Sequence, residues 1–192
     1  MNRNYVCKVG LILLSLTISL TAQTVSVPKE LEWKMFANND VAACAVALSA
    51  HPDGAVFVAV DQNGSLGKGA NKGSVMKLVD TDNDGTFDKK TNFAPLESVR
   101  GLMAIGKKVY VLHSTWKDAT YDTCYLSVVE DNDGDGVADG PYRVLVKGMS
   151  APEFNNSRGV DHSTNGIRMG IDGWIYIAMG DFGIVGAEGT DG

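Results

Sequence analysis

The sequence predicts an all-β fold built from a repeated unit of about 50 residues. Short apolar runs that each carry an aromatic residue follow turn signals at residues 56–60, 109–112 and 175–178. A second set of apolar runs, at residues 75–79 and 125–129, leads each time into a turn rich in Asp and Gly. Runs of this length and composition are typical of β-strands, and no long amphipathic helical stripe accompanies them.

Several short strands joined by Gly/Asp turns are typical of one blade of a β-propeller. The 192-residue chain has room for about three such units in residues 41–192. Propellers need about four to eight blades to close and to hide their sheet edges. We therefore expect residues 41–192 to form an incomplete β-propeller, and the chain to be the N-terminal part of a longer protein.

Residues 1–22 have the pattern of a secretory signal peptide. A short basic segment precedes an apolar stretch at residues 9–20, and Ala22 offers a cleavage position. The stretch is shorter than the roughly 20 apolar residues of a membrane-spanning helix. The alternative to a cleaved signal peptide is an uncleaved membrane anchor. We expect a periplasmic or secreted protein without a transmembrane span after cleavage, in which residues 23–40 form a leader segment.

Composition and cysteine content narrow the class of partner. The formal net charge of −6 argues against a nucleic-acid partner and against an anionic membrane surface, since both require a basic face.

Cys44 and Cys124 follow the signal segment, and an oxidising compartment would permit a disulfide between them. Sequence alone leaves both the paired and the free state open, because it does not give the distance between their Cα atoms.

Two acidic loops share one pattern, with Asp at positions 1, 3, 5 and 9 and Gly at position 6. Carboxylates at this spacing can surround a hard cation such as calcium, and the glycine permits the sharp turn. The alternative is a solvated Asp-rich turn that needs no metal. The candidate calcium ligands are Asp80, Asp82, Asp84 and Asp88 in the first loop and Asp131, Asp133, Asp135 and Asp139 in the second.

A carboxylate stands beside an imidazole at Asp161-His162, in a polar segment that we expect to be a loop. Histidine is the side chain best suited to take a proton near neutral pH. Loops held on a rigid sheet often carry function, so His162 is a candidate general base, with a plain surface pair as the alternative. The following run, residues 174–179, lacks polar residues and is expected to be a buried strand.

The segment around this pair is similar to the glucose/sorbosone dehydrogenase family, in its membrane-bound dehydrogenase branch. Members of this family are β-propeller quinoproteins that oxidise sugars with pyrroloquinoline quinone (PQQ). The similarity rests on three features: His162, the turn Gly170-x-Asp172-Gly173 with the aliphatic-aromatic strand after it, and the ending Gly180-Asp181-x-Gly183.

The resemblance implies a six-bladed propeller, of which this chain would hold about three blades. It implies a sugar or alcohol dehydrogenase in which His162 draws the proton from the substrate hydroxyl and Asp161 orients the imidazole. PQQ would be the cofactor, and a cytochrome c the electron acceptor. Without the resemblance, a non-catalytic, calcium-stabilised propeller that binds a glycan or a partner protein is the alternative.

Basic side chains near His162 are candidates for gripping the quinone. A guanidinium can donate two parallel hydrogen bonds to a carboxylate, so Arg158 and Arg168 could bind the carboxylates of the cofactor. For Arg168, an ion pair with a nearby acid is the alternative. Arg100, one repeat earlier, is a weaker candidate. His51 belongs to a turn signal, and His113 ends a strand, where it either packs structurally or lines a central site.

Overall fold

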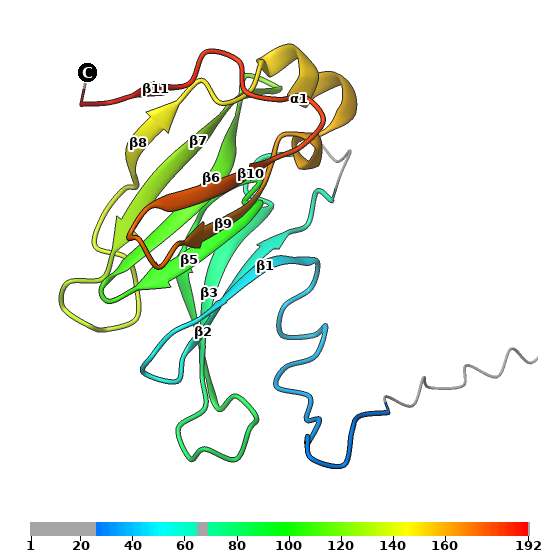
Figure 1. Ribbon diagram of the computed structural model, residues 1–192, viewed down its shortest axis with the longest axis vertical. Helices are drawn as coiled ribbons and strands as arrows, with labels where there is room; N and C mark the ends of the chain where they lie inside the picture. Colours follow the sequence, from blue (N-terminus) through cyan, green and yellow to red (C-terminus); the bar gives the residue numbers. More distant parts are fainter. Residues whose placement is uncertain (1–25, 65–68, 192) are drawn as a thin grey trace, which may run out of the picture. The chain divides into compact units, whose positions relative to one another are not determined.

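The computed structural model describes residues 26–64 and 69–191. The chain divides into two compact units, Met1–Trp33 and Lys34–Gly192, and every described strand belongs to the second. These strands form three antiparallel sheets, none of which closes on itself (Figure 1). The predicted all-β class is confirmed. The predicted signal peptide, residues 1–22, lies outside the described residues.

The first sheet is a four-stranded antiparallel meander in the order β1-β2-β3-β4. Its strands are β1 (Ala45–Ala50), β2 (Val56–Asp61), β3 (Gly73–Val79) and β4 (Lys89–Ala94). The apolar runs predicted as strands at residues 56–60 and 75–79 form β2 and β3, paired with Phe57 opposite Lys77.

The second sheet repeats the same meander and adds a short strand at its outer edge, in the order β11-β8-β7-β6-β5. Its strands are β5 (Gly101–Ile105), β6 (Lys108–Lys117), β7 (Thr120–Glu130), β8 (Arg143–Lys147) and β11 (Glu188–Gly189). The runs predicted at 109–112 and 125–129 lie in β6 and β7, so these predictions are also confirmed.

The third sheet is a hairpin of β9 (Thr164–Met169) and β10 (Ile175–Met179). Before it come the helix α1 (Pro152–Arg158) and the 3₁₀ turn η1 (Val160–His162). β9 occupies part of the segment expected to be a loop, because pairing with β10 satisfies the backbone groups of its polar residues.

Two apolar clusters join successive sheets. Phe57 and Phe93 of the first sheet meet edge to face, with ring centroids 5.0 Å apart, in a buried cluster that also holds Val111 of the second sheet. Leu112 and Ile167 belong to a second cluster, which joins the second sheet to the hairpin. The first strands of the three sheets are consecutive neighbours, since β1 contacts β5 and β5 contacts β9.

The expectation that residues 174–179 are buried is wrong. The strand forms, but Trp174 is 72% exposed and Tyr176 is 57% exposed, while Ile175 and Ile177 face the second cluster. Side chains alternate between the two faces of a strand, and here only one face is covered by the described chain. The apolar run therefore behaves as a strand with one covered face.

Cys44 is exposed and Cys124 is buried, and both are free thiols. The open question of a disulfide between them is answered in favour of the free state.

No helix within residues 26–64 and 69–191 is both long and apolar enough to cross a membrane.

Candidate functional site

Asn155 anchors the segment that presents His162. Its side-chain amide is fully buried and donates to the carbonyl of Asp122 on β7 at 2.6 Å and to the Ser150 hydroxyl at 2.9 Å. Its side-chain carbonyl accepts from the Ser163 hydroxyl at 2.6 Å. A buried amide satisfied on both sides fixes its surroundings. The turn that carries His162 is therefore held firmly on the second sheet.

The imidazole of His162, just before the hairpin, is paired with a carboxylate from the segment just after it. His162 Nδ1 lies 2.8 Å from Oδ1 of Asp181, which follows β10. Gly180 makes this approach possible, because a Cβ at that position would collide with the backbone carbonyl of His162. The amide of Phe182 also donates to that carbonyl, at 3.4 Å. Two segments far apart in the sequence thus build one imidazole–carboxylate pair.

The pair has the polarity that proton transfer requires. Nδ1–H donates to the Asp181 carboxylate, which leaves Nε2 of His162 as an acceptor. The hydrogen bond from His162 lowers the pKa of Asp181, and Arg158, whose Nη2 lies 3.9 Å from Asp181 Oδ2, acts in the same direction. Asp181 is therefore ionised at neutral pH and can stabilise a protonated imidazole.

Aromatic rings support the imidazole from one side. The His162 ring lies 5.4 Å from the ring of Phe182 at an interplanar angle of 30°. Phe182 in turn packs on Phe154 of α1 at 5.1 Å, and the guanidinium of Arg158 lies 5.6 Å from its centroid. These contacts hold the imidazole in place. Its side chain is 40% exposed, so a ligand can still reach it.

A cleft of about 570 Å³ runs along the first strands of the three sheets. It is lined by residues of β1, β5, β9 and β10, among them Leu48, Asn165, Arg168 and Tyr176. Volumes of this order are typical of small-molecule sites. His162 is three residues before Asn165, so their Cα atoms are at most about 11 Å apart. Asn165, which lines the cleft, also donates to the carbonyl of Asp161 at 2.6 Å, so the backbone next to His162 adjoins the cleft.

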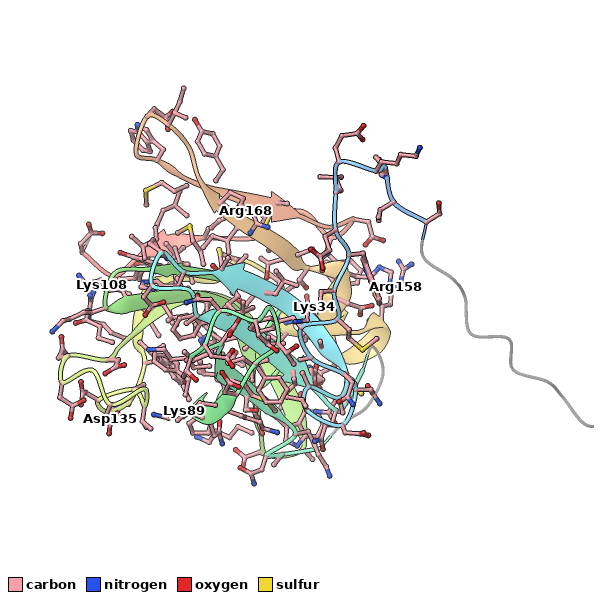
Figure 2. The ribbon with its side chains drawn as sticks, turned by 90° about the horizontal axis from the view of Figure 1, so that it is seen from below. Lys34, Lys89, Lys108, Asp135, Arg158 and Arg168 are labelled. Carbon is pink, nitrogen blue, oxygen red and sulfur yellow. The ribbon has the colours of Figure 1, made fainter. Side chains whose placement is uncertain are left out.

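The structure separates the two arginines that were predicted to act together. Figure 2 shows Arg168 on the hairpin and Arg158 away from it, and Arg158 is the last residue of α1. Arg168 lines the cleft and donates from Nη1 to the carbonyl of Ile167 at 2.9 Å. Arg158 instead contacts Asp181. Of these two arginines, Arg168 is the one placed to meet a ligand in the cleft.

Other predicted residues take different places. The carboxylate that contacts the imidazole is Asp181, which the sequence marks as part of the ending Gly180-Asp181-x-Gly183 and not as a partner of His162. The backbone carbonyl of Asp161 accepts a hydrogen bond from Asn165 Nδ2 at 2.6 Å. Arg100 lines the cleft but is buried, and its Nη2 lies 2.7 Å from Asp61 Oδ2.

The remaining two histidines have structural surroundings. His51 joins two turns, because its Nε2 lies 2.9 Å from the carbonyl of Gly106 and its Nδ1 2.6 Å from Asp53 Oδ1. This agrees with its prediction as a turn residue. His113 is only 1% exposed and its Nε2 lies 2.9 Å from the Ser127 hydroxyl, so it packs inside the second sheet.

The acidic loops adopt the same geometry at the same place in the first two sheets. In each, a carboxylate oxygen of the position-1 Asp accepts from the amide of the position-6 glycine: Asp80 from Gly85 at 2.7 Å, and Asp131 from Gly136 at 3.1 Å. Both glycines have positive φ, 86° and 91°. Residues at positions 1, 3 and 9 converge, and they are Asp80, Asp82 and Asp88 in one loop and Asp131, Asp133 and Asp139 in the other.

The donor set suits a calcium ion in both loops. One carboxylate oxygen from each of the three residues lies within 4.8 Å of the others, which is the spread expected for bonds of about 2.3–2.6 Å to a central ion. Asp84 and Asp135 lie outside these two groups. Asp84 Oδ2 lies 3.5 Å from Lys34 Nζ, and Asp135 accepts from the amide of Val137 at 2.7 Å.

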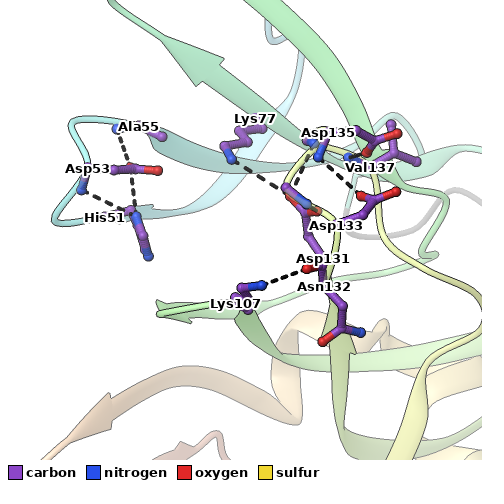
Figure 3. Close-up of polar contacts among 12 residues, drawn as sticks. His51, Asp53, Ala55, Lys77, Lys107, Asp131, Asn132, Asp133, Asp135 and Val137 are labelled. Carbon is purple, nitrogen blue, oxygen red and sulfur yellow. Dashed lines mark hydrogen bonds and ion pairs between the residues drawn. The ribbon is translucent and has the colours of Figure 1, made fainter.

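The second loop is anchored more deeply than the first. Asp131 is 7% exposed, and Lys77 reaches towards it from β3 with Nζ 3.9 Å from Oδ2 (Figure 3). The amide of Ala138 donates to the carbonyl of Phe93 on β4 at 2.9 Å. This loop therefore also fastens the second sheet to the first.

Comparison with curated proteins finds no match to this chain. A family model described as a domain of unknown function, DUF7133, matches residues 17–191. The match spans nearly the whole chain, including all three sheets, the cleft, both acidic loops and the His162–Asp181 pair. The protein therefore belongs to the DUF7133 family.

Proposed function

We propose that the three sheets are successive blades of a β-propeller. The two complete meanders have the same strand order, and their first strands lie side by side with the first strand of the hairpin. In a propeller these first strands surround the central axis. The cleft along β1, β5 and β9 would then be one side of the central channel.

On this arrangement the chain is part of a secreted or periplasmic quinoprotein dehydrogenase that oxidises a sugar or alcohol hydroxyl. The observation that carries the proposal is the 2.8 Å contact between His162 Nδ1 and Asp181 Oδ1, next to a backbone segment that adjoins the cleft. It supplies a base with an oriented imidazole and an accessible Nε2, as proton abstraction requires. The resemblance of the segment to glucose/sorbosone dehydrogenases supplies the reaction class.

The lining of the cleft is compatible with PQQ, a flat molecule with several carboxylates. Arg168 would hold a carboxylate with its guanidinium, and Tyr176 and Leu48 offer apolar surface beside it. When bound, the quinone would accept the two electrons of the oxidation as hydride from the substrate carbon. The electrons would pass on to an acceptor such as a cytochrome c.

The side chains of this chain would handle the proton. Nε2 of His162 takes the proton of the substrate hydroxyl while the carbon is oxidised, and Asp181 stabilises the resulting imidazolium. The orienting role that the resemblance assigns to Asp161 passes to Asp181 in this proposal. Phe182 limits the rotation of the imidazole and keeps water from one of its faces.

The test is dye reduction by the full-length protein loaded with PQQ and calcium, with a panel of sugars and alcohols. We expect His162→Gln to lower kcat by about 10²–10⁴-fold without weakening PQQ binding, measured by quenching of tryptophan fluorescence. Arg168→Ala should weaken PQQ binding, and Arg158→Ala, which removes a charge outside the cleft, should weaken it much less. Full activity in His162→Gln, or equal PQQ affinity in Arg168→Ala and the wild type, contradicts the proposal.

A second candidate function is a non-catalytic, calcium-stabilised propeller that binds a glycan or a partner protein. The matching carboxylate groups of the two acidic loops favour it, because they offer structural ion sites in consecutive blades. If each loop holds calcium, adding calcium to EGTA-treated protein should raise Tm. At a calcium concentration a hundredfold above Kd, each site adds about 2.7 kcal/mol to the free energy of unfolding.

Matched variants separate the loops from general electrostatics. Asp82→Asn and Asp133→Asn each remove a converging carboxylate and should reduce the calcium-dependent rise in Tm. Asp84→Asn and Asp135→Asn remove the same charge outside the converging groups and should preserve most of it. A rise in Tm that is the same in all four variants would show that calcium acts elsewhere.

A further inference from the structure

The first and second sheets enclose a second cleft, distinct from the one near His162. Its volume is about 680 Å³, within the range of small-molecule sites. Its walls come from β3 and β4 of the first sheet and from the end of β6 in the second. Both sheets are complete meanders, so the cleft is formed by elements that pack on each other within the described chain.

The cleft combines aromatic rings with uncharged and oppositely charged polar groups. Trp116 and Tyr142, both half-buried, lie with Asn92 along the lining. One lysine, Lys72, and one acid, Glu97, also line it, and their formal charges cancel. A strongly charged ligand would gain little net attraction here, while a purely apolar one would leave polar groups without partners.

The polar and aromatic groups are held in fixed positions. Glu97 joins two segments, because its carboxylate accepts from the amide of Asn71 and, at 2.9 Å, from the amide of Trp116. A carboxylate offers about four acceptor positions, so these bonds leave capacity for ligand hydroxyls. The Trp116 ring packs edge to face on Tyr121 with centroids 4.8 Å apart. Fixed side chains lose less entropy when a ligand binds.

The ring of Tyr142 packs against an uncharged imidazole. Its ring meets the buried imidazole of His113 at 4.7 Å and an angle of 74°. Burial lowers the pKa of His113 to about 4, so this ring carries no charge at neutral pH. Burial, with Asp122 and Glu97 nearby, raises the pKa of Tyr142. Its phenol therefore stays protonated and able to donate a hydrogen bond.

We propose that this cleft is a binding site for a neutral saccharide unit. A sugar ring presents C–H groups to an aromatic face and hydroxyls at its rim, and this cleft offers Trp116 for the former and Asn92 and Glu97 for the latter. The site lies outside the His162 cleft and needs neither PQQ nor catalysis. It would attach the protein to a glycan, either as a free oligosaccharide or as part of a polymer.

The experiment is a calorimetric titration of the full-length protein, without PQQ, against neutral tetrasaccharides of glucose, mannose and N-acetylglucosamine. Pull-down on the corresponding insoluble polymers distinguishes a polymer from a free sugar as the source. We expect at least one sugar to bind, and Trp116→Ala to weaken its binding about tenfold or more. Asn92→Ala, a change at an exposed strand position, should weaken it several-fold and guards against a folding defect in the Trp116 variant.

Trp174→Ala is the matched control, since Trp174 is a 72% exposed tryptophan outside the cleft. Its sugar affinity should equal that of the wild type, as should that of His162→Gln. The proposal is overturned if no sugar binds at millimolar concentration, or if Trp116→Ala and Asn92→Ala both bind normally. It is also overturned if Arg168→Ala abolishes binding, which would place the sugar in the other cleft. Loss of dehydrogenase activity bears on none of these outcomes.

Discussion

Two histidines of this protein show how location decides what an imidazole can do. His113 lies on β6, is 1% exposed, and packs between Tyr125 and Tyr142. His162 stands in a turn with its side chain 40% exposed and its Nδ1 on Asp181. Each has one hydrogen bond to a side chain, but only His162 has a carboxylate partner together with access to a ligand.

The comparison shows that a strongly shifted pKa does not by itself identify a functional histidine. His113 has the strongly shifted pKa, about 4, and its cause is burial alone. A strong shift in a cleft is often a sign of function, and His113 is part of the lining of the second cleft, but burial by itself produces such a shift in a ring that is 1% exposed. The pairing of His162 with an ionised carboxylate is the better guide to function, because it fixes the tautomer and leaves one nitrogen reachable.

The largest expected difference between the two histidines is in folding stability. His113→Ala removes a buried ring from between two tyrosines and should destabilise the protein by about 3–5 kcal/mol, comparable to other large-to-small core changes. His162→Ala removes a partly exposed ring and should cost about 1 kcal/mol or less. Urea unfolding monitored by circular dichroism measures both. Equal losses would mean that the two rings are equally integrated into the fold.

The pH dependence of stability should also come mainly from His113. The folded protein resists protonation of this ring until about pH 4, while the unfolded chain takes up the proton near pH 6.5. The stability is therefore complete above about pH 6.5 and falls as the pH drops towards 4, by up to about 3 kcal/mol. Below pH 4 both states are protonated, and the contribution no longer changes.

Variants assign that slope to one residue. His113→Gln should flatten the fall in unfolding free energy between pH 6.5 and 4, even though its overall stability is lower. His162→Gln should keep the slope of the wild type. If the slope survives in His113→Gln, it comes from other titratable groups, such as the carboxyl groups of Asp53 and Asp88, whose pKa is lowered in the folded protein.

The same contrast shows what the sequence could predict. Strands β2, β3, β6 and β7 follow from apolar, β-branched runs after turn signals, since the residues of such a run themselves favour a strand. His162 is a candidate general base from sequence because the Asp-His pair is adjacent in a polar segment. Asp181 was missed as its partner because a contact across 19 residues depends on how β9 and β10 pair, which local pattern does not specify.

Burial was harder to predict than strand formation. The run at residues 174–179 was expected to be buried because it is apolar throughout, yet its alternate side chains, Trp174 and Tyr176, are exposed. A strand forms from its own residues and one pairing partner, whereas burial of both faces requires a layer on each side. β9 (Thr164–Met169) shows the converse, because its polar sequence conceals a strand that the partner stabilises.

The smallest expected effect tests the His162–Asp181 pair itself. The hydrogen bond from His162 is the main cause that lowers the pKa of Asp181, so His162→Ala should raise that pKa towards the ordinary value of about 3.9. Carboxyl ¹³C chemical shifts followed between pH 2 and 6 would report the change directly.

Because the pKa of Asp181 is lowered in the folded protein, the pair stabilises the fold above about pH 4 and loses this contribution as Asp181 is protonated. His113→Gln is the matched control and should leave the Asp181 titration unchanged, because His113 lies on β6 of the second sheet, whereas Asp181 follows β10 of the hairpin. An unchanged titration in His162→Ala would mean that Arg158, 3.9 Å away, and not the imidazole keeps the pKa of this carboxylate low.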